Sequence, residues 1–246
     1  MSQKVALVTG ASSGIGEAIV SALVDADYLV MAAGRNKERT EQLQGNSASV
    51  CSWVGDIAAS DACADLVTSC IEKFDRLDLL VNNAGVLFPA SAEDTTDDNW
   101  GQTIGVNLSA AFFLSRQAIP HLRETKGAIV NVASDWGLVG GKRAVAYCAS
   151  KGGLVLMTKA MALDHAHEGI RINAVCPGDV ETPMLYAEGA VRGLNEVEAT
   201  READQASPTG RVTTPEEVAA LVTFLASDAA LQITGAAVPI DGGNSA

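Results

Sequence analysis

Short apolar stretches alternate with longer amphipathic stretches along the whole chain. The short stretches are continuous in apolar residues, which is typical of strands that are buried on both faces of a sheet. We predict about seven such strands. They fall at residues 4–9, 28–33, 49–54, 77–82, 127–132, 170–175 and 237–240.

The longer stretches carry apolar residues at the spacing of one helix face. Residues 14–25 show this spacing clearly, with Ile15, Ile19, Ala22 and Leu23 on the same side. A polar helix is expected from about residue 37. Further helices are predicted at 61–74, 110–124, 147–167 and 215–226. Strands that alternate with helices indicate a parallel sheet covered by helices on both faces.

No linker rich in Pro, Gly or Ser divides the chain, so residues 1–246 are predicted to form a single α/β domain. The least regular segment is 183–210, which is polar and rich in Glu and Ala. It follows the carboxyl end of a predicted strand, where ligands bind in open sheets of this class. We predict a mobile lid over the substrate there, and the alternative is a pair of surface helices without a gating role.

Composition and charge narrow the class of protein. The formal net charge is −13, from 30 acidic and 17 basic residues. Such a field repels nucleic acids and anionic membrane surfaces, so neither is expected as a partner. No apolar run approaches the roughly 18 residues that cross a bilayer. At the start of the chain, the apolar run 5–8 ends at Thr9-Gly10, far short of a signal segment.

The cysteines are odd in number and include no CxxC pair. They are Cys51, Cys63, Cys70, Cys148 and Cys176. Reduced thiols in a cytoplasmic protein are the natural interpretation. No set of metal ligands is predicted.

A glycine-rich turn, Thr9-Gly10-Ala11-Ser12-Ser13-Gly14-Ile15-Gly16, directly follows the first predicted strand. Glycines permit a tight turn and a close approach of the backbone to a diphosphate, and the N–H groups of the next helix would face its charge. The spacing G-x-x-x-G-x-G is neither G-x-G-x-x-G nor a P-loop, and a plain structural turn is the alternative. We predict dinucleotide contacts from Gly10, Ser12, Ser13, Gly14, Ile15 and Gly16.

The end of the second predicted strand bears on the choice of cofactor. A carboxylate there would accept hydrogen bonds from the adenosine ribose and repel a 2′-phosphate. This chain has Gly34-Arg35-Asn36 instead. With Arg35 and no acid, NADP is the better fit. NAD is the alternative, because Arg35 could also stack on adenine or face solvent and because Ser13 leaves the glycine turn without a basic residue.

Tyr147 and Lys151 lie four residues apart in a predicted helix of small and apolar residues. One helical turn brings the ammonium group near the phenol. A free tyrosine titrates near ~10, and a nearby cation favours the phenolate. Lowering the phenol's pKa by about 3 requires roughly 4 kcal/mol, which a fixed cation in a partly desolvated site can supply. Taken alone, however, such a pair is more often a buried tyrosine beside a lysine whose stem packs.

Together these features resemble the compact members of the short-chain dehydrogenase/reductase family, over essentially the whole chain. The resemblance is carried by the turn 9–16, Asp56, Asn82-Asn83-Ala84-Gly85, Asn107, Ser134, Tyr147-x-x-x-Lys151 and Pro177-Gly178. Each is unspecific alone, but all occur in order at predicted strand ends and helix starts. The resemblance implies a doubly wound, Rossmann-type sheet. It also implies an NAD(P)-dependent oxidoreductase that interconverts a secondary alcohol and a ketone, or a primary alcohol and an aldehyde.

The resemblance further assigns roles to four residues. Tyr147 would be the general acid/base, exchanging a proton with the substrate oxygen while hydride passes to or from the nicotinamide. Ser134 would hydrogen-bond the same oxygen, and Lys151 would also hold the nicotinamide ribose. Asn107 would use its backbone carbonyl to hold a water that links Lys151 to solvent.

The remaining implied cofactor contacts come from residues after other predicted strands. Asp56 and Ile57 would contact adenine, and Asn83 would lie along the cofactor. Val180 and Thr182 would meet the carboxamide. The segment Asp179-Val180-Glu181 also brings two acids near the nicotinamide end.

The substrate is poorly specified by the sequence. The residues expected to line its pocket are Leu87, Phe88, Pro89, Asp135, Trp136, Met184, Leu185 and Tyr186. Lys142 and Arg143 form a basic pair shortly before Tyr147. They could bind an anionic substrate, but solvated charges or subunit contacts are the favoured interpretation.

Two other functions are left open by the sequence. A catalytically silent dinucleotide-binding regulator would be expected to lack the tyrosine or the lysine. A sugar-nucleotide epimerase or dehydratase of related fold usually needs a longer chain and a different glycine spacing. The family resemblance also implies a homotetramer that is built through helix packing and the C-terminal strand, near residues 236–243.

Overall fold

Seven parallel strands form the centre of the protein, in the order β3-β2-β1-β4-β5-β6-β7. The structure, a computed structural model, describes residues 3–246. The strands are β1 (Lys4–Thr9), β2 (Tyr28–Gly34), β3 (Val50–Val54), β4 (Leu79–Asn82), β5 (Ala128–Val132), β6 (Arg171–Pro177) and β7 (Ala237–Ile240). All seven predicted strands are present, and the predicted fold class is confirmed.

Alternate residues of each strand enter separate cores on the two faces of the sheet. In β1, Ala6 and Val8 belong to one core, and Val5 and Leu7 belong to the other. Complete burial of a leucine side chain contributes about 1.5–3 kcal/mol, so both faces stabilise the strand. Burial on both faces is the reason that the strands have continuous apolar sequences.

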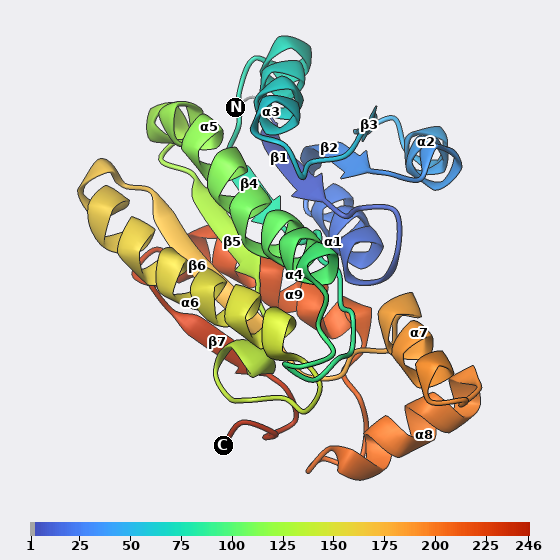
Figure 1. Cartoon of the computed structure of the whole chain (residues 1–246). Coiled ribbons are helices and arrows are strands. Elements are labelled where there is room, and N and C mark those ends of the chain that lie inside the picture. Colours follow the sequence, from blue (N-terminus) through green and yellow to red (C-terminus); the bar gives the residue numbers. More distant parts are fainter. Residues whose placement is uncertain (1–2) are drawn as a thin grey trace.

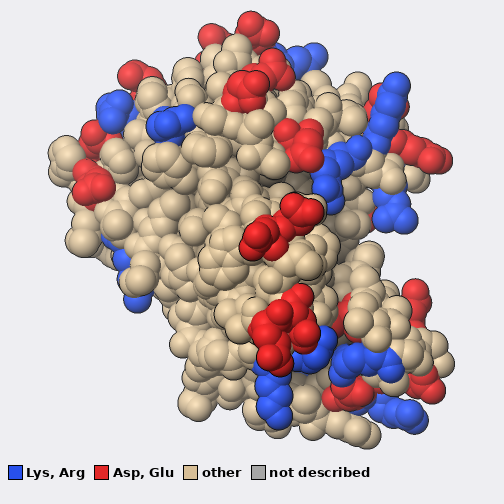
Figure 2. All heavy atoms as spheres, in the orientation of Figure 1, with Lys and Arg blue, Asp and Glu red and all other residues tan. Residues whose placement is uncertain are grey.

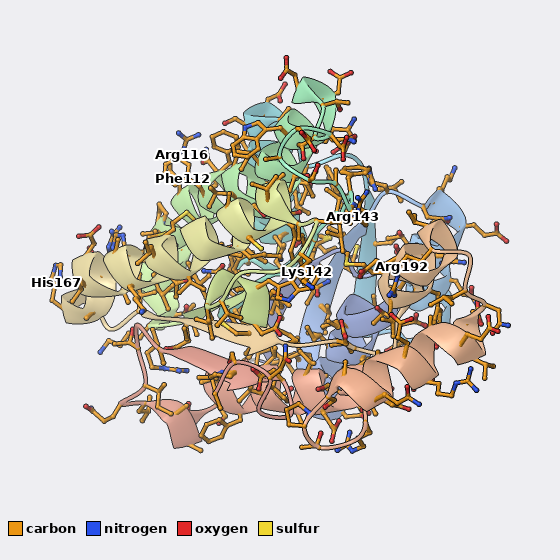
Figure 3. The ribbon with its side chains drawn as sticks, turned by 60° about the horizontal axis from the view of Figure 1, so that its bottom comes forward. Phe112, Arg116, Lys142, Arg143, His167 and Arg192 are labelled. Atoms are coloured by element: carbon orange, nitrogen blue, oxygen red, sulfur yellow. The ribbon has the colours of Figure 1, made fainter. Side chains whose placement is uncertain are left out.

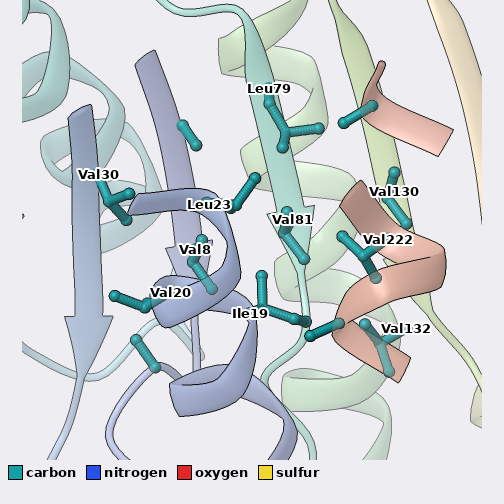
Figure 4. Packing of buried hydrophobic residues seen from close by; sticks show 14 of the residues in the cluster. Val8, Ile19, Val20, Leu23, Val30, Leu79, Val81, Val130, Val132 and Val222 are labelled. Atoms are coloured by element: carbon teal, nitrogen blue, oxygen red, sulfur yellow. The ribbon is translucent and has the colours of Figure 1, made fainter. Parts of the chain in front are cut away.

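Helices cover both faces. On one face lie α1 (Gly14–Asp25), α2 (Lys37–Asn46) and α9 (Pro215–Ala226), and on the other lie α3 (Ser60–Phe74), α5 (Ala110–Thr125) and α6 (Val145–His165). Figure 1 shows α5 and α6 in front of the sheet and α9 behind it. Between α1, α9 and the sheet, Ile19 and Leu23 pack with Val81 and Val222 (Figure 4).

One helix was not predicted from the sequence. α4 (Asp97–Ile104) begins at Thr96, whose side chain caps it by accepting a hydrogen bond from the Asn99 N–H. Its eight residues are mostly polar, and Trp100 and Ile104 are the only large apolar ones, so the stretch is too short for a clear periodic pattern. A π-helical turn, Gly105–Ser109, joins α4 to α5. Such turns often occur at functional sites.

The segment 183–210 is more regular than the sequence suggested. It contains α7 (Pro183–Val191) and α8 (Glu196–Ala206), which pack against each other. Asn195 and Glu198 form a capping box at the start of α8. The helices approach closely at Gly189, where a Cβ atom would lie 2.6 Å from that of Ala199. The pair stands at one end of the sheet as a separate lobe (Figure 1).

A buried polar network fixes the neighbouring ends of β4 and β5. The Asn82 Nδ2 donates to the Asn131 Oδ1 at 2.8 Å and to the Ser115 Oγ on α5 at 3.2 Å. The Asn131 Nδ2 donates in turn to the Thr158 Oγ1 on α6 at 2.8 Å. Two strands and two helices are thereby held in a fixed arrangement next to residues 83 and 134. Among residues 3–246, no helix is both long and apolar enough to cross a membrane.

Candidate active site

A cleft opens at the carboxyl end of the sheet, where the strand order changes direction between β1 and β4. Ligands bind at this position in open α/β sheets. The cavity has a volume of about 410 Å³, within the range of small-molecule sites. Its walls come from the segments that follow β1 to β6, together with parts of α6 and α7. Figure 2 shows the surface hollowed between the main body and the α7–α8 lobe.

The glycine turn after β1 forms one wall because its backbone lies against other backbone. Gly10 and Gly14 have φ angles of +62° and +55°, which side-chain-bearing residues rarely adopt. A Cβ atom on Gly16 would lie 2.1 Å from the Gly10 carbonyl oxygen. The Asn83 Nδ2 donates to the Thr9 and Gly10 carbonyl oxygens at 2.9 and 3.2 Å. Asn83 thus holds the turn as well as lining the cleft.

Thr9 connects the ends of β1 and β4, a role that the sequence analysis missed. Its buried Oγ1 accepts from the N–H groups of Asn83 and Ala84 at 3.0 and 3.1 Å. The same hydroxyl donates to the Val81 carbonyl oxygen at 3.3 Å. A hydroxyl at the end of the first strand was the available signal, but its partners are about 70 residues away.

Nearly all predicted site residues meet at this cleft. The lining includes Gly10, Ser12, Ser13, Gly14, Ile15, Gly16, Arg35, Asp56, Ile57, Asn83, Ser134, Tyr147, Lys151, Val180 and Thr182. Asn107 lies behind the wall instead. Of the residues expected to line the substrate pocket, Leu87, Asp135, Trp136, Met184 and Leu185 line the cleft, whereas Phe88, Pro89 and Tyr186 do not. The lining also includes Asn36 and Arg39, which the sequence analysis did not select. Arg39 is in the first turn of α2, where the Asn36 Oδ1 accepts a hydrogen bond from the Arg39 N–H.

Tyr147, Lys151 and Ser134 come together where α6 passes the end of β5. Lys151 is 3% exposed, and its Nζ donates to the Val132 carbonyl oxygen at 2.7 Å. The same Nζ lies 5.5 Å from the centre of the Tyr147 ring. Burial lowers the pKa of Lys151 to about 8. Lys151 is therefore not a snorkelling lysine whose ammonium group reaches solvent. Its amine is held inside the site by the Val132 carbonyl oxygen.

Burial raises the pKa of the Tyr147 phenol, and a hydrogen bond with Ser134 opposes this effect only in part. The sequence analysis expected Lys151 to lower the pKa of Tyr147, but the protein groups together raise it. Removing a phenol from water disfavours its charged form more than the surrounding dipoles favour it. The indole of Trp136 packs edge-on against the phenol ring, with centroids 6.1 Å apart, and adds to the desolvation.

Asn107 lies in the π-helical turn and acts through its side chain in this structure. Its Oδ1 accepts from the Val86 N–H at 2.8 Å, and its Nδ2 donates to the Val86 carbonyl oxygen at 3.0 Å and to the Ser150 Oγ at 3.1 Å. A Cβ atom on Gly85 would be 3.5 Å from the Asn107 Oδ1 and 3.6 Å from the Lys151 Nζ. Asn107 therefore fixes the backbone beside the lysine.

The two acids after β6 have different surroundings. Asp179 lines the cleft, as does Glu188 on α7, whereas Glu181 lies outside it and accepts a hydrogen bond from the Tyr186 hydroxyl at 3.2 Å. Desolvation, with Asp135 adding to it, raises the pKa of the Asp179 carboxyl. Desolvation, with Asp179 adding to it, raises the pKa of the Glu188 carboxyl. The cleft thus has an acidic wall at its α7 end.

Lys142 and Arg143 do not belong to this wall. Both side chains are exposed in the loop before α6, and neither lines the cleft (Figure 3). The Arg143 carbonyl oxygen accepts from the Ala90 N–H at 2.7 Å, so the loop backbone is fixed while the charged groups stay in solvent.

Comparisons with known proteins agree with this geometry. A family model described as enoyl-(acyl carrier protein) reductase matches residues 10–245. The meso-2,3-butanediol dehydrogenase of Serratia marcescens is 40% identical over 245 residues, 99% of this chain and 95% of that protein. A structure of an actinorhodin polyketide ketoreductase variant with NADPH has a TM-score of 0.93 and 33% identity, covering 99% of this chain and 97% of the other.

The chain belongs to the short-chain dehydrogenase/reductase family. A 3-ketoacyl-(acyl-carrier-protein) reductase from Brucella melitensis, complexed with NADH, is also similar, with a TM-score of 0.91, 31% identity and coverage of 99% and 98%. This short-chain dehydrogenase/reductase is an NAD(P)-dependent oxidoreductase that acts on CH–OH groups. The main functional prediction is thereby confirmed over its two alternatives, the silent regulator and the sugar-nucleotide epimerase or dehydratase.

Gly16→Ala should weaken dinucleotide binding by about tenfold or more, because the added methyl group collides with the Gly10 carbonyl oxygen. The free energy of unfolding should also fall by roughly 1–3 kcal/mol. Fluorescence titration with NADH and NADPH and urea denaturation measure the two effects. Gly45→Ala is the matched control. A Cβ there would meet nothing within 4 Å, so cofactor affinity should stay unchanged. Equal affinities in the two variants would contradict the role of the turn.

Proposed function

We propose that Tyr147 is the general acid/base of this dehydrogenase, with Ser134 and Lys151 as its partners. One observation carries the proposal. A phenol, a hydroxyl and a buried amine converge on one cleft, and a turn that only glycines can form lies in the same cleft. No single motif would justify this assignment, but their convergence supports a site that joins a dinucleotide to a proton-exchanging oxygen.

A bound nicotinamide would supply or accept the hydride. In reduction, the Tyr147 hydroxyl would donate its proton to the carbonyl oxygen, and its raised pKa keeps that proton in place at neutral pH. In oxidation the same oxygen would accept the hydroxyl proton. Lys151, with a pKa of about 8, is largely protonated at neutral pH and would stabilise the phenolate formed in this step.

We assign the other cleft residues to the cofactor. The glycine turn, with Gly10, Ser12, Ser13, Gly14, Ile15 and Gly16, would hold the diphosphate. Asp56 and Ile57 would contact adenine, Asn83 would lie along the cofactor, and Val180 and Thr182 would meet the carboxamide. Lys151 would also hold the nicotinamide ribose. Asn107 would hold, through its backbone carbonyl, a water that links Lys151 to solvent.

We propose NADP as the preferred cofactor. Arg35 and Arg39 both line the cleft beyond the end of β2, and no carboxylate follows Gly34 directly. Two guanidinium groups at this position would favour a 2′-phosphate. Asp56, which also lines the cleft, has its Oδ1 engaged by the Ala58 N–H at 2.9 Å.

We propose that the substrate is a neutral alcohol or ketone. No N–H or O–H group among residues 3–246 donates a hydrogen bond to the Asp179 or Glu188 carboxylates, although both line the cleft beside Met184 and Leu185. Such groups can accept hydrogen bonds from further hydroxyls of a substrate, and they repel a carboxylate. Lys142 and Arg143 lie outside the cleft. Arg192, whose charge lowers the pKa of both carboxyls in part, also lies outside it and pairs with Glu202.

We further propose that residues 1–246 act as one dinucleotide-binding and catalytic unit, in which 183–210 moves as a lid. Its α7 contributes Met184, Leu185 and Glu188 to the cleft, so closure of this segment would exclude water from the substrate. Assembly as a cytoplasmic homotetramer is the accompanying proposal. It is supported by exposed apolar side chains on α5 and α6, namely Phe112 (Figure 3), Leu156 and Leu163.

Tyr147→Phe should reduce turnover by at least about a hundredfold, because it removes the proton-exchanging oxygen and leaves the ring in place. NADP(H) affinity should change by less than about threefold, since the glycine turn is untouched. Absorbance of the reduced nicotinamide during a screen of alcohols and ketones measures turnover. Tyr28→Phe is the control. Tyr28 is the first residue of β2 and so lies at the other end of the sheet from the cleft, and turnover should stay unchanged. Retained redox turnover in Tyr147→Phe would refute the assignment.

Arg39→Ala should raise the KM for NADP by about tenfold, because it removes one of two charges near the 2′-phosphate. The KM for NAD should change little, so the ratio of the two kcat/KM values reports the effect. Lys37→Ala removes a charge from the same helix outside the cleft and serves as the control. Equal losses for NADP and NAD would show that Arg39 does not read the phosphate.

Asp179→Asn and Glu188→Gln should each shift selectivity toward anionic substrates. The measured quantity is the ratio of kcat/KM for meso-2,3-butanediol to that for 3-hydroxybutyrate, which should fall by about tenfold because a like charge is removed. Glu181→Gln, whose carboxylate lies outside the cleft, should leave the ratio unchanged. A wild-type protein that prefers 3-hydroxybutyrate would contradict the proposal.

A further inference from the structure

Asp135 connects the proposed catalytic serine to the C-terminal tail. It is 4% exposed and directly follows Ser134. Its Oδ1 accepts from the Ser134 Oγ at 2.9 Å and from the Trp136 N–H at 2.7 Å. Its Oδ2 accepts from the Asn244 Nδ2 at 2.7 Å, across 109 residues of sequence. Both carboxylate oxygens are thereby engaged inside the protein.

The tail that carries Asn244 is itself a built loop. Asp241 accepts hydrogen bonds from the N–H groups of Gly243 and Ser245, both at 2.9 Å, and from the Ser245 hydroxyl. The Asn244 N–H donates to the Asp241 carbonyl oxygen at 3.2 Å. On the side of the cleft, a Cβ atom on Gly178 would be 3.0 Å from the Asp241 Cβ, so the loop packs against the end of β6. Asn244 is therefore presented to Asp135 by a fixed support.

This arrangement decides which way the Ser134 hydroxyl points. A serine has one hydroxyl hydrogen and two acceptor lone pairs. Because the hydrogen is donated to Asp135, the lone pairs remain for other groups, and the Trp136 N–H occupies one of them at 3.1 Å. The Tyr147 phenol is the other neighbour of this hydroxyl, and its hydrogen bond with Ser134 lowers the pKa of Tyr147, as a donor to the phenolate does. Asp135 and the phenolate thus compete for the single Ser134 hydrogen, and Asp135 sets where it points.

We propose that Asp135, held in place by Asn244 of the C-terminal tail, is a positioning residue that sets the orientation of the Ser134 hydroxyl and so prepares Tyr147 for proton exchange. The inference rests on the proposed acid/base role of Tyr147. In this arrangement the last residues of the chain complete the active site, although they lie outside the cleft wall.

Because Asp135 is charged, its replacement should change the pH dependence of the reaction, which the loss of a purely structural contact would not do. After burial and the bond with Ser134, Asp135 is the next influence on the phenol, and it raises the pKa of Tyr147. The other ionisable groups that face this phenol are Lys151 and Cys148 on α6 and Glu188 on α7. A substitution at Asp135 leaves all three in place.

Asp135→Asn should lower kcat by roughly tenfold to a hundredfold, because an amide can turn its donor toward Ser134 and reverse the orientation of the hydroxyl. The pH at which alcohol oxidation reaches half its maximum should fall by roughly 1, because a like charge near the phenol is lost. The KM for the cofactor should stay within about twofold of the wild type. Initial rates between pH 6 and 10 provide all three numbers.

Asn244→Ala tests the tail separately. It should lower kcat by about fivefold or more with unchanged cofactor KM. Asn244→Asp keeps the side-chain size, removes the donor, and should cause at least as large a loss. Asn46→Ala is the matched control, since Asn46 is exposed at the end of α2 and lies outside the tail. Circular dichroism and thermal midpoints of each variant establish that the fold is retained.

The outcomes separate this inference from the acid/base proposal. An unchanged kcat and pH profile in Asp135→Asn would overturn the positioning role, as would equal losses in Asn244→Ala and Asn46→Ala. If instead Tyr147→Phe keeps its turnover, the acid/base role itself is wrong, whatever the Asp135 variants do.

Discussion

The site depends on one close approach, that of the glycine turn to the end of β4. Neighbouring parallel strands carry the two segments together, but side chains at Gly10 or Gly16 would hold them apart. Thr9 and Asn83 then fasten the contact with hydrogen bonds to backbone atoms. Because backbone groups satisfied in this way need no water, the cleft can be narrow and still have stable walls.

A second constraint is the burial of an amine. Removing an ammonium group from water is costly, and Lys151 recovers part of that cost through the Val132 carbonyl oxygen. The pKa of Lys151 is consequently about 8. The amine is still mostly protonated at neutral pH, but it gives up its proton more readily than a lysine in solvent. Desolvation has the opposite effect on the neighbouring Tyr147 phenol, whose pKa it raises. Burial therefore moves the two pKa values apart, so that without a bound ligand the phenol holds its proton firmly while the amine releases its own more readily.

The fold and much of the candidate site could be predicted because their signals are local in sequence. Continuous apolar strands revealed the sheet, and glycines, Tyr147 and Lys151 stand at fixed spacings. Contacts between distant segments could not be predicted in this way. Thr9 meets Asn83, and Asp135 meets Asn244, with no pattern that links them. Asp179 and Glu181 are two residues apart, yet only Asp179 lines the cleft, while Glu181 bonds the Tyr186 hydroxyl, a contact that the spacing does not reveal. The direction of the phenol's pKa depended on burial, which spacing does not report.

The cleft is electrostatically polarised despite the acidity of the whole chain. At the end near β2, Arg35 and Arg39 outnumber one acid, Asp56, whereas Asp179 and Glu188 stand at the end near α7. A net charge of −13 would weaken the approach of an anionic cofactor, so the local cations must offset the general field at the point of contact. Such a gradient would orient a ligand that carries phosphates at one end and an uncharged reacting group at the other. The same gradient works against a ligand bound in reverse, because its phosphates would then face two carboxylates.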